Sequence, residues 1–198
     1  MAKAMSAQNL VTPTAEGLAA SAQAASSGKG LPPVEAWNPP FCGDLDMRIA
    51  RDGTWFYQGT PIGRPPLVRL FSTILKREGD KYFLVTPVEK VGITVDDAPF
   101  VAVDFTVRED TITFVTNVGD TVTAGPDAPI RVERDAETEE PSPYVLVRRN
   151  LEALIDRKSF YRLVDIGETD TVDGVDWFGV RSMGQFFPFI PAEALQGL

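Results

Sequence analysis

Apolar and polar residues alternate along several short stretches of the chain, and this period of two predicts β-strands. The stretches 47–50 and 54–57 flank an Asp-Gly pair at 52–53, which is typical of a tight hairpin turn. A second hairpin is predicted over 101–107 and 111–117, where valine and phenylalanine alternate with polar residues. Further strands are predicted at 81–87, 91–95, 159–166 and 176–182.

Two stretches have the spacing of an amphipathic helix instead. The first covers 67–78, follows two prolines that suit a first helical turn, and ends at Gly79. Its predicted buried residues are Leu67, Leu70, Phe71, Ile74 and Leu75. The second covers 144–158, with a predicted buried stripe of Tyr144, Val147, Leu151, Leu154 and Ile155.

The order of these elements suggests an internal duplication. Without gaps, residues 67–87 and 146–166 are identical at seven of 21 positions, at an offset of 79. Chance similarity is the alternative explanation. We therefore predict an α+β fold of two tandem, structurally related domains, each a hairpin, a helix and a strand. The domains are expected at 36–99 and 100–190, with a break near Pro99.

The two ends of the chain are expected to be tails. Residues 1–35 contain no aromatic residue and no sustained apolar period, which predicts a flexible segment. Residues 191–198 are expected to form a short C-terminal tail. The string SAQAA resembles a signal cleavage site, but no unbroken apolar segment precedes it, so we expect a cytoplasmic protein.

The distribution of charge along the chain excludes two classes of binding partner. The 198-residue chain has a formal net charge of -9. Residues 41–90 have eight basic and six acidic residues, whereas 91–198 have nine basic and twenty acidic residues. This acidity opposes binding to duplex nucleic acid and to anionic membrane surfaces. We expect neither as a partner.

Missing residue types exclude several chemistries. The chain has no histidine, which rules out a Ser-His-Asp triad or histidine-ligated metal within it. Its one cysteine, Cys42, forms no intrachain disulfide and is interpreted as a small, partly buried thiol. No GxGxxG or Walker sequence occurs. We expect no cofactor, no metal and no catalytic residue.

Four arginines are the strongest candidates for a ligand site: Arg64, Arg69, Arg148 and Arg149. An arginine near a helix N-terminus opposes the helix dipole, so a ligand is one explanation for it. Guanidinium groups bind phosphate or carboxylate in a bidentate manner, and the free N–H groups of a helix start also favour anions. The alternative is that each arginine pairs with a local carboxylate such as Glu89, Asp120 or Asp165.

Two further sets of residues are candidates for the same ligand. Trp55 and Tyr57 could stack on a base, although aromatic residues on short strands are commonly part of a core. Thr86, Glu89 and Lys90 could supply polar groups at a strand end, or form a turn with a surface ion pair.

Several longer motifs carry a family resemblance. They are DGTWFY, PIGR followed by LVRLF, YFLVTPVEKVGI, DDAPF, TNVGD, PYVLVRRNLEALIDR and WFGVRSMGQFF. With these motifs the chain resembles the domain-of-unknown-function 1285 family of bacterial proteins over residues 36–190. The resemblance implies two related tandem domains, the second loosely similar to pleckstrin-homology folds. It also implies a ligand site between the domains for a nucleotide-type ligand, and a role in signal transduction.

Three functions follow as hypotheses. The first is a non-catalytic ligand-binding or sensory module that holds an anionic, nucleotide-like molecule between the two domains. The second is a protein–protein interaction or scaffold protein acting as a homodimer. The third, disfavoured by the lack of histidine, is a carboxylate-based or metal-dependent enzyme.

Overall fold

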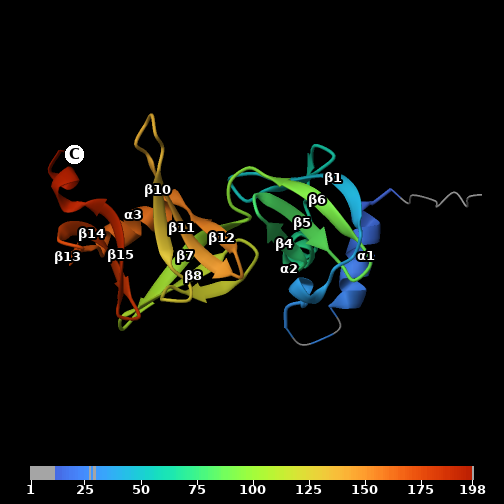
Figure 1. The fold of residues 1–198 in the computed structure, drawn as a ribbon, viewed down its shortest axis with the longest axis horizontal. Helices are drawn as coiled ribbons and strands as arrows, with labels where there is room; N and C mark the ends of the chain where they lie inside the picture. The colour runs from blue at the N-terminus through green and yellow to red at the C-terminus, as the bar shows by residue number, and fades with distance from the viewer. Residues whose placement is uncertain (1–11, 27, 29, 198) are drawn as a thin grey trace, which may run out of the picture.

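The computed structural model describes residues 12–26, 28 and 30–197. In this part of the chain, two α+β domains follow one another, and a small third sheet lies at the C-terminal end (Figure 1). None of the helices described is long and apolar enough to cross a membrane.

The N-terminal domain is built on one mixed sheet with the strand order β3-β2-β1-β6-β5-β4. Its elements are β1 (Phe41–Ile49), β2 (Trp55–Tyr57), β3 (Thr60–Pro61), α2 (Pro65–Thr73), β4 (Leu75–Glu78), β5 (Lys81–Val85) and β6 (Lys90–Val95). The hairpin predicted around the Asp-Gly turn is confirmed, because β1 and β2 pair antiparallel. The only parallel pair described in this sheet joins β1 to β6.

The C-terminal domain has a second mixed sheet with the order β10-β11-β12-β7-β8-β9, and a three-stranded sheet follows it. Its elements are β7 (Phe100–Arg108), β8 (Thr111–Thr116), β9 (Thr121–Thr123), β10 (Ile130–Arg134), β11 (Pro141–Arg148), β12 (Leu151–Ile155), α3 (Arg157–Asp165), β13 (Glu168–Val172), β14 (Val175–Ser182), β15 (Gln185–Pro191) and the 3-10 helix η2 (Ala192–Gly197). The predicted hairpin is confirmed as β7 and β8.

The two six-stranded sheets have the same topology. In each, the first strand pairs antiparallel with the second and parallel with the sixth. The first residues of equivalent strands are 55 to 61 positions apart. The domains are therefore structurally related, but the offset of 79 is wrong. It aligns residues of helix α2 with strand β11, because the two segments share leucine, valine and arginine rather than a structural position.

The second predicted helix is also wrong. Residues 144–158 form most of β11, all of β12 and the start of α3. Arg149 has a φ of 53° and makes a tight turn between the strands, and burial alternates along β12. The helix begins later, where the Asp156 side chain accepts a hydrogen bond from Ser159 N at 2.7 Å. It occupies most of the strand predicted at 159–166.

The first predicted helix is correct only in its first part. Helix α2 ends at Thr73, and residues 75–78 form the edge strand β4, which pairs with β5. Leu75 stays fully buried as the first residue of that strand. A buried apolar residue fits either element, so helical spacing alone could not locate the boundary.

The predicted N-terminal tail is wrong for the residues that the structure describes. Helix α1 (Ala15–Ala25) is capped by Thr14, and η1 (Val34–Ala36) follows it. Leu18, Ala22 and Val34 are fully buried in the core. Small alanines let a helix pack closely with few large apolar residues. Residues 1–11 lie outside the described residues.

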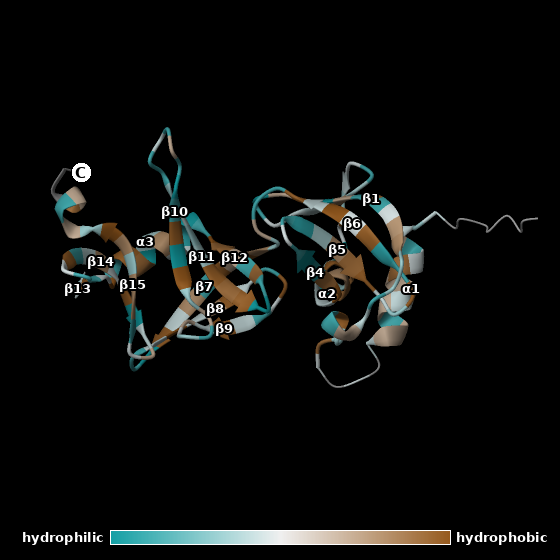
Figure 2. Ribbon diagram, viewed as in Figure 1, coloured by the Kyte–Doolittle hydropathy of each residue, from teal (hydrophilic) through white to brown (hydrophobic). Residues whose placement is uncertain are grey.

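Hydrophobic positions concentrate on the sheets, and the loop between β10 and β11 is mainly hydrophilic (Figure 2). Most of the buried apolar side chains of both domains belong to one connected core cluster, which includes Phe71 of α2 and Phe100 of β7. At the C-terminal end of the chain, the segment predicted to be a tail has secondary structure instead. Pro191 is the last residue of β15, and residues 192–197 form η2.

Candidate functional site: a cleft between the two domains

A cleft of about 780 Å³ lies where the two domains meet. The N-terminal domain contributes the β1–β2 turn, the segment before α2 and the first turns of α2. The C-terminal domain contributes the β8–β9 turn. The lining residues are Gly53, Thr54, Trp55, Ile62, Gly63, Pro65, Pro66, Val68, Arg69, Asn117, Val118 and Gly119.

Asn117 ties the two domains together at this cleft. Its Nδ2 donates to the backbone oxygen of Gly53 at 3.3 Å, and its Oδ1 accepts from Val101 N at 3.0 Å. Gly53 has a φ of 86°, and a Cβ there would lie 2.5 Å from Asn117 Nδ2. Glycine at 53 therefore permits both the turn and the close contact between domains.

Among the residues that the structure describes, Arg69 is the only charged one that lines the cleft. It extends from α2 to the β8–β9 turn, where a Cβ on Gly119 would lie 3.2 Å from Arg69 Nη1. Within the described part of the chain, Arg69 takes part in none of the ion pairs. The guanidinium is therefore open to an anion.

The start of α2 cannot bind an anion through its backbone, contrary to the sequence-based expectation. Its first two residues, Pro65 and Pro66, have no N–H group. The next two N–H groups, of Leu67 and Val68, both donate to Arg64 O, at 3.0 and 3.3 Å. Anion binding in this cleft thus depends on side chains.

Arg148 and Arg149 do not face this cleft. Arg148 pairs with Asp120, as in the alternative interpretation, and donates to Ser72 O at 2.8 Å. That carbonyl lies in the last turn of α2, where a cation interacts favourably with the helix dipole. Arg149 lies 3.7 Å from Glu35, and burial lowers the pKa of its guanidinium. Both arginines hold the domains together.

The structure therefore does not bring the four predicted arginines into one cleft. Arg64 is the exposed N-cap residue of α2 and does not line it. The expected equivalence of Arg69 and Arg148 also fails, because Arg148 ends a strand rather than beginning a helix.

Of the two candidate aromatic residues, only Trp55 lines the cleft. Its side chain is 1% exposed and stacks on Phe71, with ring centroids 6.3 Å apart. The indole Nε1 is buried and has no hydrogen-bond partner within the described part of the chain. Tyr57 is half-buried on β2 and lies outside the cleft lining.

The segment with Thr86, Glu89 and Lys90 is a turn between β5 and β6. Thr86 N donates to Glu89 O at 2.9 Å, and Thr86 Oγ1 accepts from Glu89 N at 3.2 Å. Lys90 Nζ lies 3.0 Å from a Glu78 carboxylate oxygen. These contacts fit the alternative interpretation, a turn with an ion pair, and none of the three residues lines the cleft.

Sequence reasoning missed the part of the site that comes from the C-terminal domain. Asn117, Val118 and Gly119 lie within the TNVGD motif, and Ile62 and Gly63 lie within PIGR. The motifs were visible as family features, but nothing in their spacing placed them opposite each other.

Comparison with known families agrees with this two-domain arrangement. Residues 32–98 match the N-terminal domain of DUF1285, a domain of unknown function, and residues 99–189 match its C-terminal domain. The chain belongs to the DUF1285 family. No curated protein matches it.

Two crystal structures of DUF1285 family proteins are similar to the chain. The protein from Silicibacter pomeroyi DSS-3 is 63% identical, with a TM-score of 0.82, over 91% of this chain and 98% of its own. The protein from Shewanella baltica OS155 is 28% identical, with a TM-score of 0.49, over 61% of this chain and 91% of its own.

Proposed function

We propose that this DUF1285 protein is a non-catalytic ligand-binding module in signal transduction, and that the interdomain cleft holds an anionic, nucleotide-like small molecule. One observation carries the proposal. In a chain with a net charge of -9, the described residues that line the cleft include one arginine and no acidic residue. The local charge therefore favours an anion where the charge of the whole molecule does not.

The cleft suits a ligand with an apolar body and one anionic group. Its volume falls within the range of about 300–1,000 Å³ found for small-molecule sites. Ile62, Val68 and Val118 offer apolar side chains, and Arg69 offers a bidentate donor for phosphate or carboxylate. The Trp55 side chain borders the cleft but is 1% exposed and stacks on Phe71, so it offers no open ring face for a base.

The same lining favours binding over catalysis. As far as the structure describes the chain, this lining contains no carboxylate, lysine or cysteine, and the sequence has no histidine. Catalysis by proton transfer needs a positioned acid or base, which these side chains do not provide.

Isothermal titration calorimetry with adenosine 5′-monophosphate (AMP), adenosine and inorganic phosphate tests the proposal. AMP should bind more tightly than either part alone. Arg69→Gln should weaken AMP binding about 10- to 150-fold, the equivalent of about 1.5–3 kcal/mol for a hydrogen bond to a charged group. It should leave adenosine binding nearly unchanged.

Arg64→Gln is the matched control, because Arg64 lies five positions earlier and outside the cleft. It should bind AMP like the unaltered protein. If none of the three probes binds, or if both variants lose the same affinity, the proposed site is wrong.

A further inference from the structure

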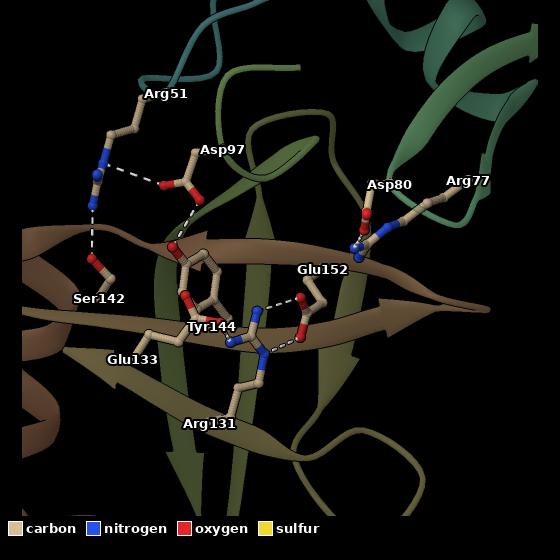
Figure 3. Close-up of polar contacts among 9 residues, drawn as sticks. All are labelled: Arg51, Arg77, Asp80, Asp97, Arg131, Glu133, Ser142, Tyr144 and Glu152. Atoms are coloured by element: carbon tan, nitrogen blue, oxygen red, sulfur yellow. Dashed lines mark hydrogen bonds and ion pairs between the residues drawn. The ribbon is translucent and has the colours of Figure 1, made fainter. Parts of the chain in front are cut away.

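A polar cluster crosses the domain boundary at the turn that borders the cleft (Figure 3). Tyr144 donates its hydroxyl hydrogen to Asp97 Oδ1 at 2.7 Å. Asp97 Oδ2 lies 3.3 Å from Arg51 Nε, and Arg51 Nη2 donates to Ser142 Oγ at 2.8 Å. We call Arg51, Asp97, Ser142 and Tyr144 the boundary cluster.

The members of the boundary cluster come from three parts of the chain. Arg51 belongs to the β1–β2 turn of the N-terminal domain, and Asp97 lies between β6 and β7, where the chain passes from one domain to the other. Ser142 and Tyr144 belong to β11 of the C-terminal domain. The cluster therefore links both domains to the segment that joins them.

Tyr144 is the fixed member of the cluster. Its side chain is 5% exposed, and the Arg131 guanidinium lies 4.4 Å from the centre of its ring. Arg131 is itself held by two hydrogen bonds to Glu152, at 2.6 and 2.7 Å. The Tyr144 hydroxyl therefore has a defined position from which to hold Asp97.

The contact between Asp97 and Arg51 is weaker than the hydrogen bond between Tyr144 and Asp97. The Arg51 side chain is 62% exposed, and the buried Asp97 Oδ2 has an ion pair with it but no hydrogen bond. An exposed ion pair of this kind contributes little by itself. A modest change in domain orientation is therefore enough to break or re-form this contact.

The β1–β2 turn belongs both to the boundary cluster and to the cleft, through two residues that lie two positions apart. Arg51 reaches the cluster, whereas Gly53 binds Asn117 and lines the cleft. Three hydrogen bonds close the turn: Gly53 N to Ala50 O, Ala50 N to Thr54 O, and Thr54 N to Asp52 Oδ1, each at 2.9 Å. The turn should therefore move as a unit, carrying Arg51 and Gly53 together.

We infer that Arg51, Asp97 and Tyr144 are positioning residues for the cleft. Together with the Asn117 and Arg148 contacts, they set the orientation of the two domains, and with it the position of the β1–β2 turn where it meets the β8–β9 turn at the cleft. Ligand affinity and domain orientation are consequently coupled, as required of a module that reports occupancy to a partner. The inference rests on the proposed function.

The test uses Arg51→Gln and Tyr144→Phe, with Arg48→Gln as the matched control. Arg48 pairs with Asp96 at 2.6 Å, next to Asp97, but both of those residues lie outside the boundary cluster and the cleft lining. AMP affinity should fall about two- to fivefold in each cluster variant and stay unchanged in the control. In the double variant the two losses should not add, because both variants break one network.

A second readout separates domain orientation from ligand binding. Spin labels at Thr94→Cys and Thr106→Cys, in a Cys42→Ser background, place one label on an exposed position in each domain. Both cluster variants should shift or broaden the distance distribution between the labels, and AMP should narrow it in the unaltered protein.

The outcomes distinguish the inference from the proposed function. Unchanged distances in both cluster variants overturn the inference, whether or not AMP binds. Lower thermal stability with unchanged AMP affinity also overturns it, because the cluster would then be merely structural. Changed distances in a protein that does not bind AMP would overturn the proposed function and support the domain-orienting role.

Discussion

Tyr144 holds its proton to higher pH than an ordinary tyrosine does. Burial and the hydrogen bond to Asp97 raise its pKa from 10.0 to about 12. Because the pKa in the folded state lies above the unfolded value, this group stabilises the fold fully below pH 10. The stabilisation is lost as pH rises towards 12.

The free energy of unfolding should therefore fall between pH 9 and pH 11.5, and Tyr144→Phe should reduce that fall. Urea denaturation of both proteins at the two pH values measures the difference. Arginines and glutamates nearby, such as Arg131 and Glu133, are present in both proteins and cancel in the comparison. Equal losses in both would show that Tyr144 does not titrate as described.

Gly119 gives a residue-scale test of how Arg69 is placed. Gly119→Ala introduces strain at a φ of 86° and a Cβ 3.2 Å from Arg69 Nη1. Gly174→Ala introduces similar strain at a φ of 80° but meets nothing within 4 Å. Each should cost about 1–2 kcal/mol of stability. Only Gly119→Ala should also weaken AMP binding.

Thermal melts and calorimetry of the two glycine variants measure both effects. Equal AMP affinity in the two variants would mean that AMP binding does not depend on the contact between Arg69 and Gly119.

At this scale the sequence identified Arg69 and Trp55 but not their surroundings. Helical spacing placed Arg69 on a helix, which is correct, but Arg69 is the middle residue of α2 rather than one near its start. The partner turn at 117–119 lies about fifty positions away in the other domain, and no local pattern encodes such a contact. Arg148 was misplaced because its segment was interpreted as a helix.

At the scale of elements, α1 shows how composition can mislead. A segment rich in alanine and serine lacks large apolar residues, yet a single stripe through Leu18 and Ala22 is enough to dock it. Leu18 is fully buried in the core of the N-terminal domain.

Leu18→Ala should therefore destabilise the protein by about 2–5 kcal/mol, the usual range for a buried leucine. Leu31→Ala is the control, because that side chain is 50% exposed and should change stability by less than about 0.5 kcal/mol. Denaturant titration measures both. A Leu18→Ala protein as stable as the control would mean that α1 does not pack in solution.

Hairpins were predictable and the second helix was not, for a physical reason. The strands β7 and β8 carry a clear period of two and are joined by a short polar turn. The segment 144–158 contains leucines and valines that fit both periods, and the turn at Arg149 has no glycine or proline to mark it. Tertiary packing decided the outcome.

At the scale of the whole molecule, the duplication is visible in topology rather than in sequence identity. Six strands repeat in the same order with the same single parallel pair, while helix α2 follows the third strand of its sheet and α3 follows the sixth. The residues that are identical at an offset of 79 do not occupy equivalent positions in the two sheets. Homodimer formation, a cytoplasmic location and the pleckstrin-homology likeness stay predictions.

An NMR titration with AMP tests whether the interdomain cleft is a ligand site. The indole N–H of a tryptophan gives a signal separate from the backbone, so Trp55 can be compared with Trp37 and Trp177. AMP should shift the signals of the Trp55 indole, Gly53 and Gly119, and leave the Trp177 indole unmoved. Shifts confined to other surfaces, or no shifts at millimolar AMP, would contradict a ligand site in this cleft.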